Sequence, residues 1–181
     1  MTTIKLYTPQ YQEQIINLIL NIQQNEFNVP IPLEEQPGLL KISDFYQKGK
    51  GNFWVAVDQD EVVGTIALLD LGNYQAALQK LFVHKDYRGK EIGVGQQLLD
   101  TLLDWAINQL IRTIYLGTTE VYKAAHCFYR KNGFIEISMA ELPKSFSLLK
   151  VDTKFYKYDV FTPYSCIQPS KSLGLTQEHH V

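Results

Sequence analysis

The sequence has little that would suggest a disulfide-stapled, membrane-spanning or polyanion-binding protein. It has two cysteines in 181 residues, and Cys127 and Cys166 form neither a C-x-x-C motif nor a Cys/His ligand spacing, so we expect no structural disulfide and no metal site. No apolar run reaches the ~18 residues that a spanning helix needs, and the N-terminus lacks a basic stretch leading into an apolar one. The formal net charge of -2 provides no general attraction for nucleic acid. We therefore expect a cytoplasmic protein without metal, membrane or nucleic-acid partners.

The composition is that of an ordinary globular protein, with 45% hydrophobic and 20% charged residues. The sequence contains no internal repeat, low-complexity segment or long linker, which predicts a single domain over residues 1–161. Residues 162–181 contain Pro163 and Pro169 but no clear period. Whether this C-terminal tail is partly disordered or wraps the domain stays open.

Apolar periodicity predicts one α/β domain whose middle strands form an antiparallel meander. Compact apolar runs predict strands over residues 4–7, 53–57, 62–69, 76–83, 113–118, 134–138 and 155–161. Helical spacing of apolar residues predicts helices over residues 12–23, 39–46, 94–107 and 122–132.

A glycine-rich loop lies between a predicted strand and a predicted helix. It reads Y-R-G-K-E-I-G-V-G over residues 87–95. Glycines let successive backbone N–H groups converge, and the helix N-terminus adds partial positive charge, so a pyrophosphate fits there. Arg88 and Lys90 add full charges at the rim. The loop matches neither the nucleoside triphosphate P-loop nor the strict G-x-G-x-x-G dinucleotide motif; a tight turn with no ligand is the alternative.

A second motif, A-A-H-C-F-Y-R-K-N-G-F over residues 124–134, follows at the next predicted helix. Together the two motifs resemble the GNAT superfamily of N-acetyltransferases, whose signature is a strand, then R/Q-x-x-G-x-G/A, then a helix. Arg88, Glu91 and Gly93 occupy the anchor positions, with Glu91 where the first glycine usually lies. The stretches L-P-K-S-F and V-D-T-K-F-Y resemble a bacterial subgroup of that family with mostly unassigned acceptors.

The resemblance implies a GNAT-type fold, classed as α/β (α+β), with a mixed, mostly antiparallel sheet of roughly six to seven strands flanked by about four helices. It also implies acetyl-coenzyme A as donor and a primary amine of a small molecule or peptide as acceptor, by direct attack on the thioester. Tyr129 would protonate the departing thiolate. The residues implied to bind the coenzyme are Leu81, Phe82, Val83, Arg88, Gly89, Lys90, Glu91, Ile92, Gly93, Val94, Gly95, Thr119, Lys123 and Phe128.

The proton acceptor for the amine stays unassigned. Part of the family has a glutamate on the strand at the position aligned with Ala77, whereas Glu120, His84 and water are the alternatives here. His126 is expected to be an exposed polar residue and Cys127 to be packing filler. Acceptor recognition is expected from the first helical pair, which carries Glu34 and Glu35, and from the late loop over residues 143–146.

Other functions remain compatible with these patterns. A non-catalytic acyl-coenzyme A sensor would keep the cleft without turnover, and an α/β nucleotide-binding protein would bind ATP or NAD instead. Monomer and homodimer both stay open, since the apolar residues over 155–161 suit a core strand or a dimer surface.

Overall fold

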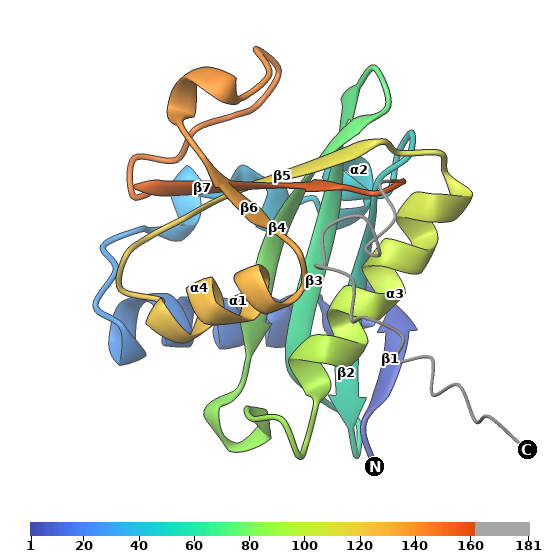
Figure 1. The fold of residues 1–181 in the computed structure, drawn as a ribbon. Coiled ribbons are helices and arrows are strands. Elements are labelled where there is room, and N and C mark those ends of the chain that lie inside the picture. The colour runs from blue at the N-terminus through green and yellow to red at the C-terminus, as the bar shows by residue number, and fades with distance from the viewer. Residues whose placement is uncertain (162–181) are drawn as a thin grey trace, which may run out of the picture.

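The chain folds around a mixed sheet of seven strands with helices on both faces (Figure 1). The computed structural model describes residues 1–161, so the expected tail and Cys166 lie outside the described residues. The strands are β1 (Thr3–Leu6), β2 (Asn52–Asp58), β3 (Glu61–Gly72), β4 (Gln75–Val83), β5 (Thr113–Thr118), β6 (Ile135–Ile137) and β7 (Lys154–Asp159). The α-helices are α1 (Gln12–Leu20), α2 (Ile42–Tyr46), α3 (Val94–Asn108) and α4 (Lys123–Lys131). A π-helical turn, η2 (Asn21–Glu26), extends α1, and 3-10 turns occupy Pro9–Tyr11, Leu33–Glu35, Pro37–Leu39, Lys85–Tyr87 and Met139–Glu141.

The strand order is β1-β2-β3-β4-β5-β7-β6. All neighbouring strands are antiparallel except β4 and β5, which are parallel. Parallel neighbours need a long crossover connection, and α3 supplies it here. The expected fold class, with a mostly antiparallel sheet between helices, is confirmed.

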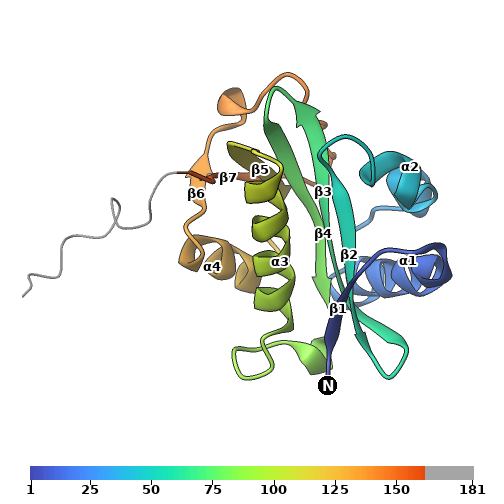
Figure 2. The same ribbon diagram turned by 90° about the vertical axis from the view of Figure 1, so that its right-hand side faces the viewer.

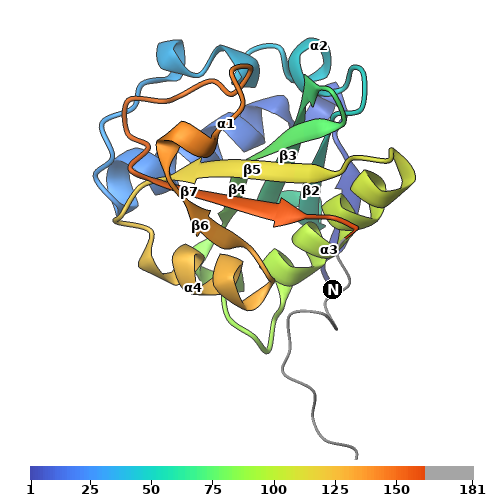
Figure 3. The same cartoon turned by 45° about the horizontal axis from the view of Figure 1, so that its top comes forward.

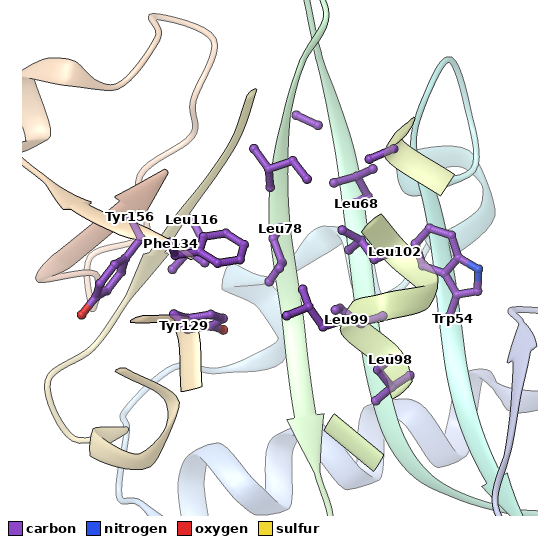
Figure 4. Packing of buried hydrophobic residues seen from close by; sticks show 14 of the residues in the cluster. Trp54, Leu68, Leu78, Leu98, Leu99, Leu102, Leu116, Tyr129, Phe134 and Tyr156 are labelled. Carbon is purple, nitrogen blue, oxygen red and sulfur yellow. The ribbon is translucent and has the colours of Figure 1, made fainter. Parts of the chain in front are cut away.

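The helices form two layers, with α1 and α2 on one face of the sheet and α3 and α4 on the other (Figure 2). On the α3 face, Leu98, Leu99 and Leu102 are fully buried and pack with residues of β2 to β5, as Figure 4 shows. Helices α1 and α2 cover the opposite face with a separate apolar cluster. The central strands are therefore buried on both sides, which explains why their sequence is apolar without alternation.

Strands β4 and β5 separate soon after they begin. Only Gln75–Ala77 of β4 pairs with Thr113–Tyr115 of β5. Beyond these pairs β5 and β7 run across the direction of β2 to β4 (Figures 1 and 3). The later halves of β4 and β5 therefore leave an opening in the sheet.

A bulge interrupts β4 just where this opening starts. The register moves between the pair Ala67–Gln79 and the pair Thr65–Phe82, so β4 carries an extra residue. Lys80 has φ 56°, a left-handed conformation that is uncommon for a residue with a side chain. The Thr65 hydroxyl, fully buried, donates a hydrogen bond of 2.6 Å to the Lys80 carbonyl and holds the bulge.

Two expectations about α4 side chains are wrong. His126 was expected at the surface but is 5% exposed, and Cys127 was expected in the packing but is exposed. The reason is the phase of the helix: His126 lies three residues before the buried Tyr129 and shares its face, while Cys127 falls on the other side.

Candidate active site

A cavity of about 960 Å³ occupies the opening between β4 and β5. Its walls come from η2 and the chain after it, the later half of β4, the loop before α3, the start of α4 and the loop between β6 and β7. This volume is typical of a site for a cofactor-sized ligand.

The loop before α3 and the first turn of this helix bring free backbone amides to one end of the cavity. Gly89 and Gly93 have φ values of 109° and 67°, which a side chain would strain. The Gly93 N–H donates to the Gly89 carbonyl at 2.9 Å. The next three amides, of residues 94–96, open α3 and make no backbone hydrogen bond within residues 1–161. Such amides at a helix N-terminus form a site for an anion.

The Arg88 side chain docks this loop onto η2. Its guanidinium forms a bidentate ion pair with Glu26, in which Nη2 lies 2.9 Å from Oε2, and its Nε donates to the Val83 carbonyl at 2.8 Å. The guanidinium also lies over the Phe27 ring, 5.7 Å from its centre. The hydrogen bond from Arg88 lowers the pKa of Glu26. The charge of Arg88 is thus engaged by protein, whereas Lys90 is exposed.

Most of the residues singled out in the sequence line this cavity. The lining includes Leu81, Phe82, Val83, Arg88, Gly89, Lys90, Gly93, Gly95, Thr119, Lys123, Phe128 and Tyr129. Three others do not line it. The side chains of Glu91 and Ile92 are exposed to solvent, and that of Val94 is 1% exposed in the core, so Val94 offers only its backbone amide.

Tyr129 reaches the cavity from α4. Its side chain is 5% exposed, and its ring packs against Phe134 and Tyr156, with centres 5.5 and 5.9 Å away (Figure 4). The Tyr129 hydroxyl makes no hydrogen bond within residues 1–161, whereas every fully buried side-chain nitrogen and oxygen there has a partner. The hydroxyl oxygen is therefore not fully buried, and it opens onto the cavity. Burial, with a smaller contribution from Tyr156, raises the pKa of the Tyr129 hydroxyl. The phenol is therefore protonated at neutral pH.

His126 fixes the packing behind Tyr129. Its Nε2 lies 3.0 Å from the Thr119 carbonyl, and its Nδ1 lies 3.0 Å from the Tyr156 hydroxyl. Because a carbonyl only accepts, Nε2 carries a hydrogen and donates it to the Thr119 carbonyl. The histidine ties α4 to β7 and to the end of β5, and both of its nitrogens are satisfied.

Comparison with known proteins decides the family. An acetyltransferase of the GNAT family from Staphylococcus aureus Mu50 is 41% identical, with a TM-score of 0.86; the match covers 88% of this chain and 99% of that one. The chain belongs to the GNAT family of acetyltransferases. A family model described as an acetyltransferase (GNAT) domain also matches residues 49–136. An acetyltransferase from Streptococcus agalactiae 2603 is 32% identical, with a TM-score of 0.83, over 87% of this chain and 98% of that one.

A longer curated relative matches the same GNAT domain. The N-acetylaspartate synthetase of Xenopus tropicalis is 36% identical over 104 residues, which are 55% of this chain and 37% of that protein. The chain therefore spans little more than a third of that relative's length.

The residues expected to serve as base or acceptor contacts lie mostly away from the GNAT cavity. Ala77 is buried in β4, and the His84 ring accepts a hydrogen bond from the Asp86 amide. Glu120 is exposed beside the cavity without lining it. Glu34 and Glu35 belong to the 3-10 turn Leu33–Glu35, outside the lining.

Three charged residues that the sequence analysis did not single out line the cavity: Lys80 on β4, Lys131 at the end of α4 and Asp152 in the loop before β7. A lysine inside the apolar run A-A-L-Q-K-L-F-V was a signal for the first. Nothing local distinguished Asp152, because its loop has no period. Within the described residues, no group of three or more His, Cys, Asp or Glu side chains could hold a metal ion, and none of the helices there has both the length and the apolar character of a membrane-spanning segment.

Proposed function

We propose that this GNAT domain transfers the acetyl group of acetyl-coenzyme A to a primary amine of a small molecule or peptide. The observation that carries the proposal is one continuous cavity that joins the free amides at the start of α3, the unpaired edge of β4 and the Tyr129 hydroxyl. The coenzyme offers a diphosphate, an amide-rich arm and a thioester in that order. These three groups match the free amides, the unpaired edge of β4 and the Tyr129 hydroxyl, respectively.

The diphosphate would bind at the loop. The free amides of residues 94–96 would donate to its oxygens, and Lys90 would add charge at the rim. Glycine at 89 and 93 keeps side chains out of this space. Because Arg88 is paired with Glu26, its contribution would be to hold the loop in place, or to exchange partners when phosphate arrives.

The pantetheine arm would lie along residues Leu81, Phe82 and Val83, whose pairing with β5 is missing. Its amides would use the unpaired backbone groups of this strand, as an added strand would. Thr119, Lys123 and Phe128 would line the other side. A backbone N–H near the bulge could then donate to the oxyanion that forms when the amine attacks.

Tyr129 would act as the general acid. After the amine attacks the thioester carbon, the carbon–sulfur bond breaks and the leaving thiolate needs a proton. Because burial raises the pKa of Tyr129, the phenol holds its proton until the thiolate forms. No covalent enzyme intermediate is required.

The test is thiol release from acetyl-coenzyme A with a panel of amines, measured for the wild type, Tyr129→Phe and Tyr158→Phe. Tyr158 lies outside the cavity and is the matched control. We expect Tyr129→Phe to lower kcat by about 100-fold or more, while coenzyme affinity and the control stay unchanged. Binding without release for every amine would instead support a non-catalytic sensor, and thermal stabilisation by ATP or NAD alone would support a nucleotide-binding protein.

We also propose that the protein acts in the bacterial cytoplasm, as a monomer or homodimer, without nucleic-acid or membrane partners. The two structural relatives described above come from Staphylococcus aureus and Streptococcus agalactiae. A thioester donor that carries a diphosphate does not cross a bilayer unaided, which favours a site of action where the donor is held. Fractionation of the native cells, with gel filtration of the purified chain, would test both points.

A further inference from the structure

Charge is distributed unevenly around the cavity. Among its described lining residues five are basic, whereas Asp152 is the only acidic one. Four of the basic residues lie on the loop before α3 and on α4, at the proposed coenzyme end: Arg88, Lys90, Lys123 and Lys131. The fifth, Lys80, lies on β4 and contacts the chain that follows η2. A polycationic acceptor would therefore meet more positive than negative charge along the cavity.

Lys80 is held in place by two buried glutamines. Its ammonium donates to Gln36 Oε1 at 2.5 Å. Gln36 and Gln23 donate to each other's side-chain oxygens at 2.9 and 3.0 Å, and both are buried. An ammonium has three donors, and Gln36 uses one of them. Lys80 also lines the cavity, and its other two donors make no hydrogen bond within residues 1–161.

The bulge in β4 directs the Lys80 side chain toward Gln36. The bulge turns Gln79 and Lys80 to the same face of the sheet, where Gln79 accepts from the Tyr46 hydroxyl and Lys80 donates to Gln36. Burial lowers the pKa of Lys80 to about 8, against an opposing effect of Asp152. A left-handed lysine with a partly desolvated charge is unfavourable for folding alone, which points to a role for that charge.

Asp152 faces the cavity from the other side. Its Oδ2 accepts from the Leu149 amide at 3.2 Å and lies against Gly117 of β5, where a Cβ atom would come within 2.7 Å of it. Its Oδ1 has no partner within residues 1–161, and no buried side-chain oxygen there lacks one, so Oδ1 is open to the cavity. Lys80 and Asp152 form no ion pair among the described residues. Burial raises the pKa of Asp152, and the charge of Lys80 opposes that shift.

Two opposite charges that face one space without touching suit a ligand that carries both charges itself. We propose that the acceptor is a small amino-carboxylate, whose carboxylate binds the Lys80 ammonium and whose amine binds the Asp152 carboxylate. This inference rests on the proposed acetyl transfer and specifies its substrate class.

Asp152, together with Tyr129, also completes the proton balance of the reaction. The bound ammonium gives one proton to Asp152, and the free amine forms the carbon–nitrogen bond with the thioester carbon. When the carbon–sulfur bond breaks, Tyr129 protonates the sulfur, and the second nitrogen proton returns to the Tyr129 oxygen through water. Asp152 then releases its proton to solvent. Ammonium and thioester thus become amide, thiol and one proton.

The test is a panel of straight-chain amino acids of increasing length, each paired with its carboxamide. We expect kcat/KM to favour the amino acid over its carboxamide at one preferred length, by about 10- to 100-fold, the effect of one charge-assisted hydrogen bond. Lys80→Gln should abolish this preference, with kcat/KM falling far more for the amino acids than for their carboxamides. Lys80→Arg should restore part of it. Asp152→Asn should lower kcat/KM for both members of each pair.

Matched controls are Lys48→Gln and Asp104→Asn, both at exposed positions outside the cavity. Thermal unfolding checks that each variant folds, and the affinity for acetyl-coenzyme A checks that the coenzyme-binding end of the cavity is intact. Transfer to amines with no carboxylate preference, or equal losses for both members of each pair in Lys80→Gln, would overturn this inference while leaving acetyl transfer intact. If no amine accepts the acetyl group although the coenzyme binds, the proposed function itself fails.

Discussion

Replacement of Thr65 by valine tests whether one buried hydroxyl maintains the bulge that exposes Lys80 to the cavity. The two side chains have the same shape, so the change creates no cavity, but it removes the 2.6 Å hydrogen bond to the Lys80 carbonyl. A buried carbonyl left without its partner costs about 1–3 kcal/mol. For a chain of this size each kcal/mol lowers Tm by about 2–4 °C. We expect Thr65→Val to lower the free energy of unfolding by about 1–3 kcal/mol. We also expect kcat/KM for the amine to fall by more than any loss of coenzyme affinity.

Urea titration followed by circular dichroism measures the free energy of unfolding, and Thr101→Val is the matched control. The Thr101 hydroxyl also donates to a backbone carbonyl, that of Gln97 at 2.8 Å, but on the exposed side of α3. Its loss should cost less than about 0.5 kcal/mol. A Thr65→Val variant as mild as the control, with unchanged kinetics, would refute the idea that this hydroxyl holds the bulge.

Three further changes probe the ends of the cavity. Gly117→Ala places a Cβ atom 2.7 Å from the Asp152 carboxylate. We therefore expect the free energy of unfolding to fall by about 1–3 kcal/mol and the KM for the amine to rise at unchanged coenzyme affinity. An unchanged KM would argue against a role for Asp152. Glu26→Gln releases Arg88 and should tighten acetyl-coenzyme A binding by about 2- to 5-fold in calorimetry; weaker binding would mean that Arg88 only docks the loop. Because burial lowers the pKa of Lys80 to about 8, the preference for amino acids over carboxamides should be present below that pH and decline above it, and a pH-independent ratio would exclude this lysine.

The parts of the fold that depend on local pattern could be predicted from the sequence. Residues 113–118 were expected to form a strand and do so as β5, and the glycine-rich loop stands where a strand meets α3. Apolar runs and glycine positions are local signals, so they can be recognised without knowledge of the tertiary structure. The helix expected over residues 39–46 begins only at Ile42, because the preceding Pro37–Leu39 forms a 3-10 turn instead.

The acceptor end could not be predicted in the same way. Lys80 and Asp152 are far apart in sequence, and they face one space only because β4 bulges and the loop before β7 lies against Gly117. A bulge arises from the pairing of two strands, which no local pattern encodes. The burial of His126, in contrast, was available from its spacing of three residues from Tyr129 on one helix.

The most direct test of the coenzyme cleft is amide NMR of the labelled protein, titrated with acetyl-coenzyme A. Binding as described predicts that the amides of residues 81–83 and 89–96 shift together and become protected from hydrogen exchange, while those of β1 and α2 stay unchanged. If the ligand binds but shifts other amides and leaves these two segments unaffected, the diphosphate and the pantetheine arm do not lie in this cavity.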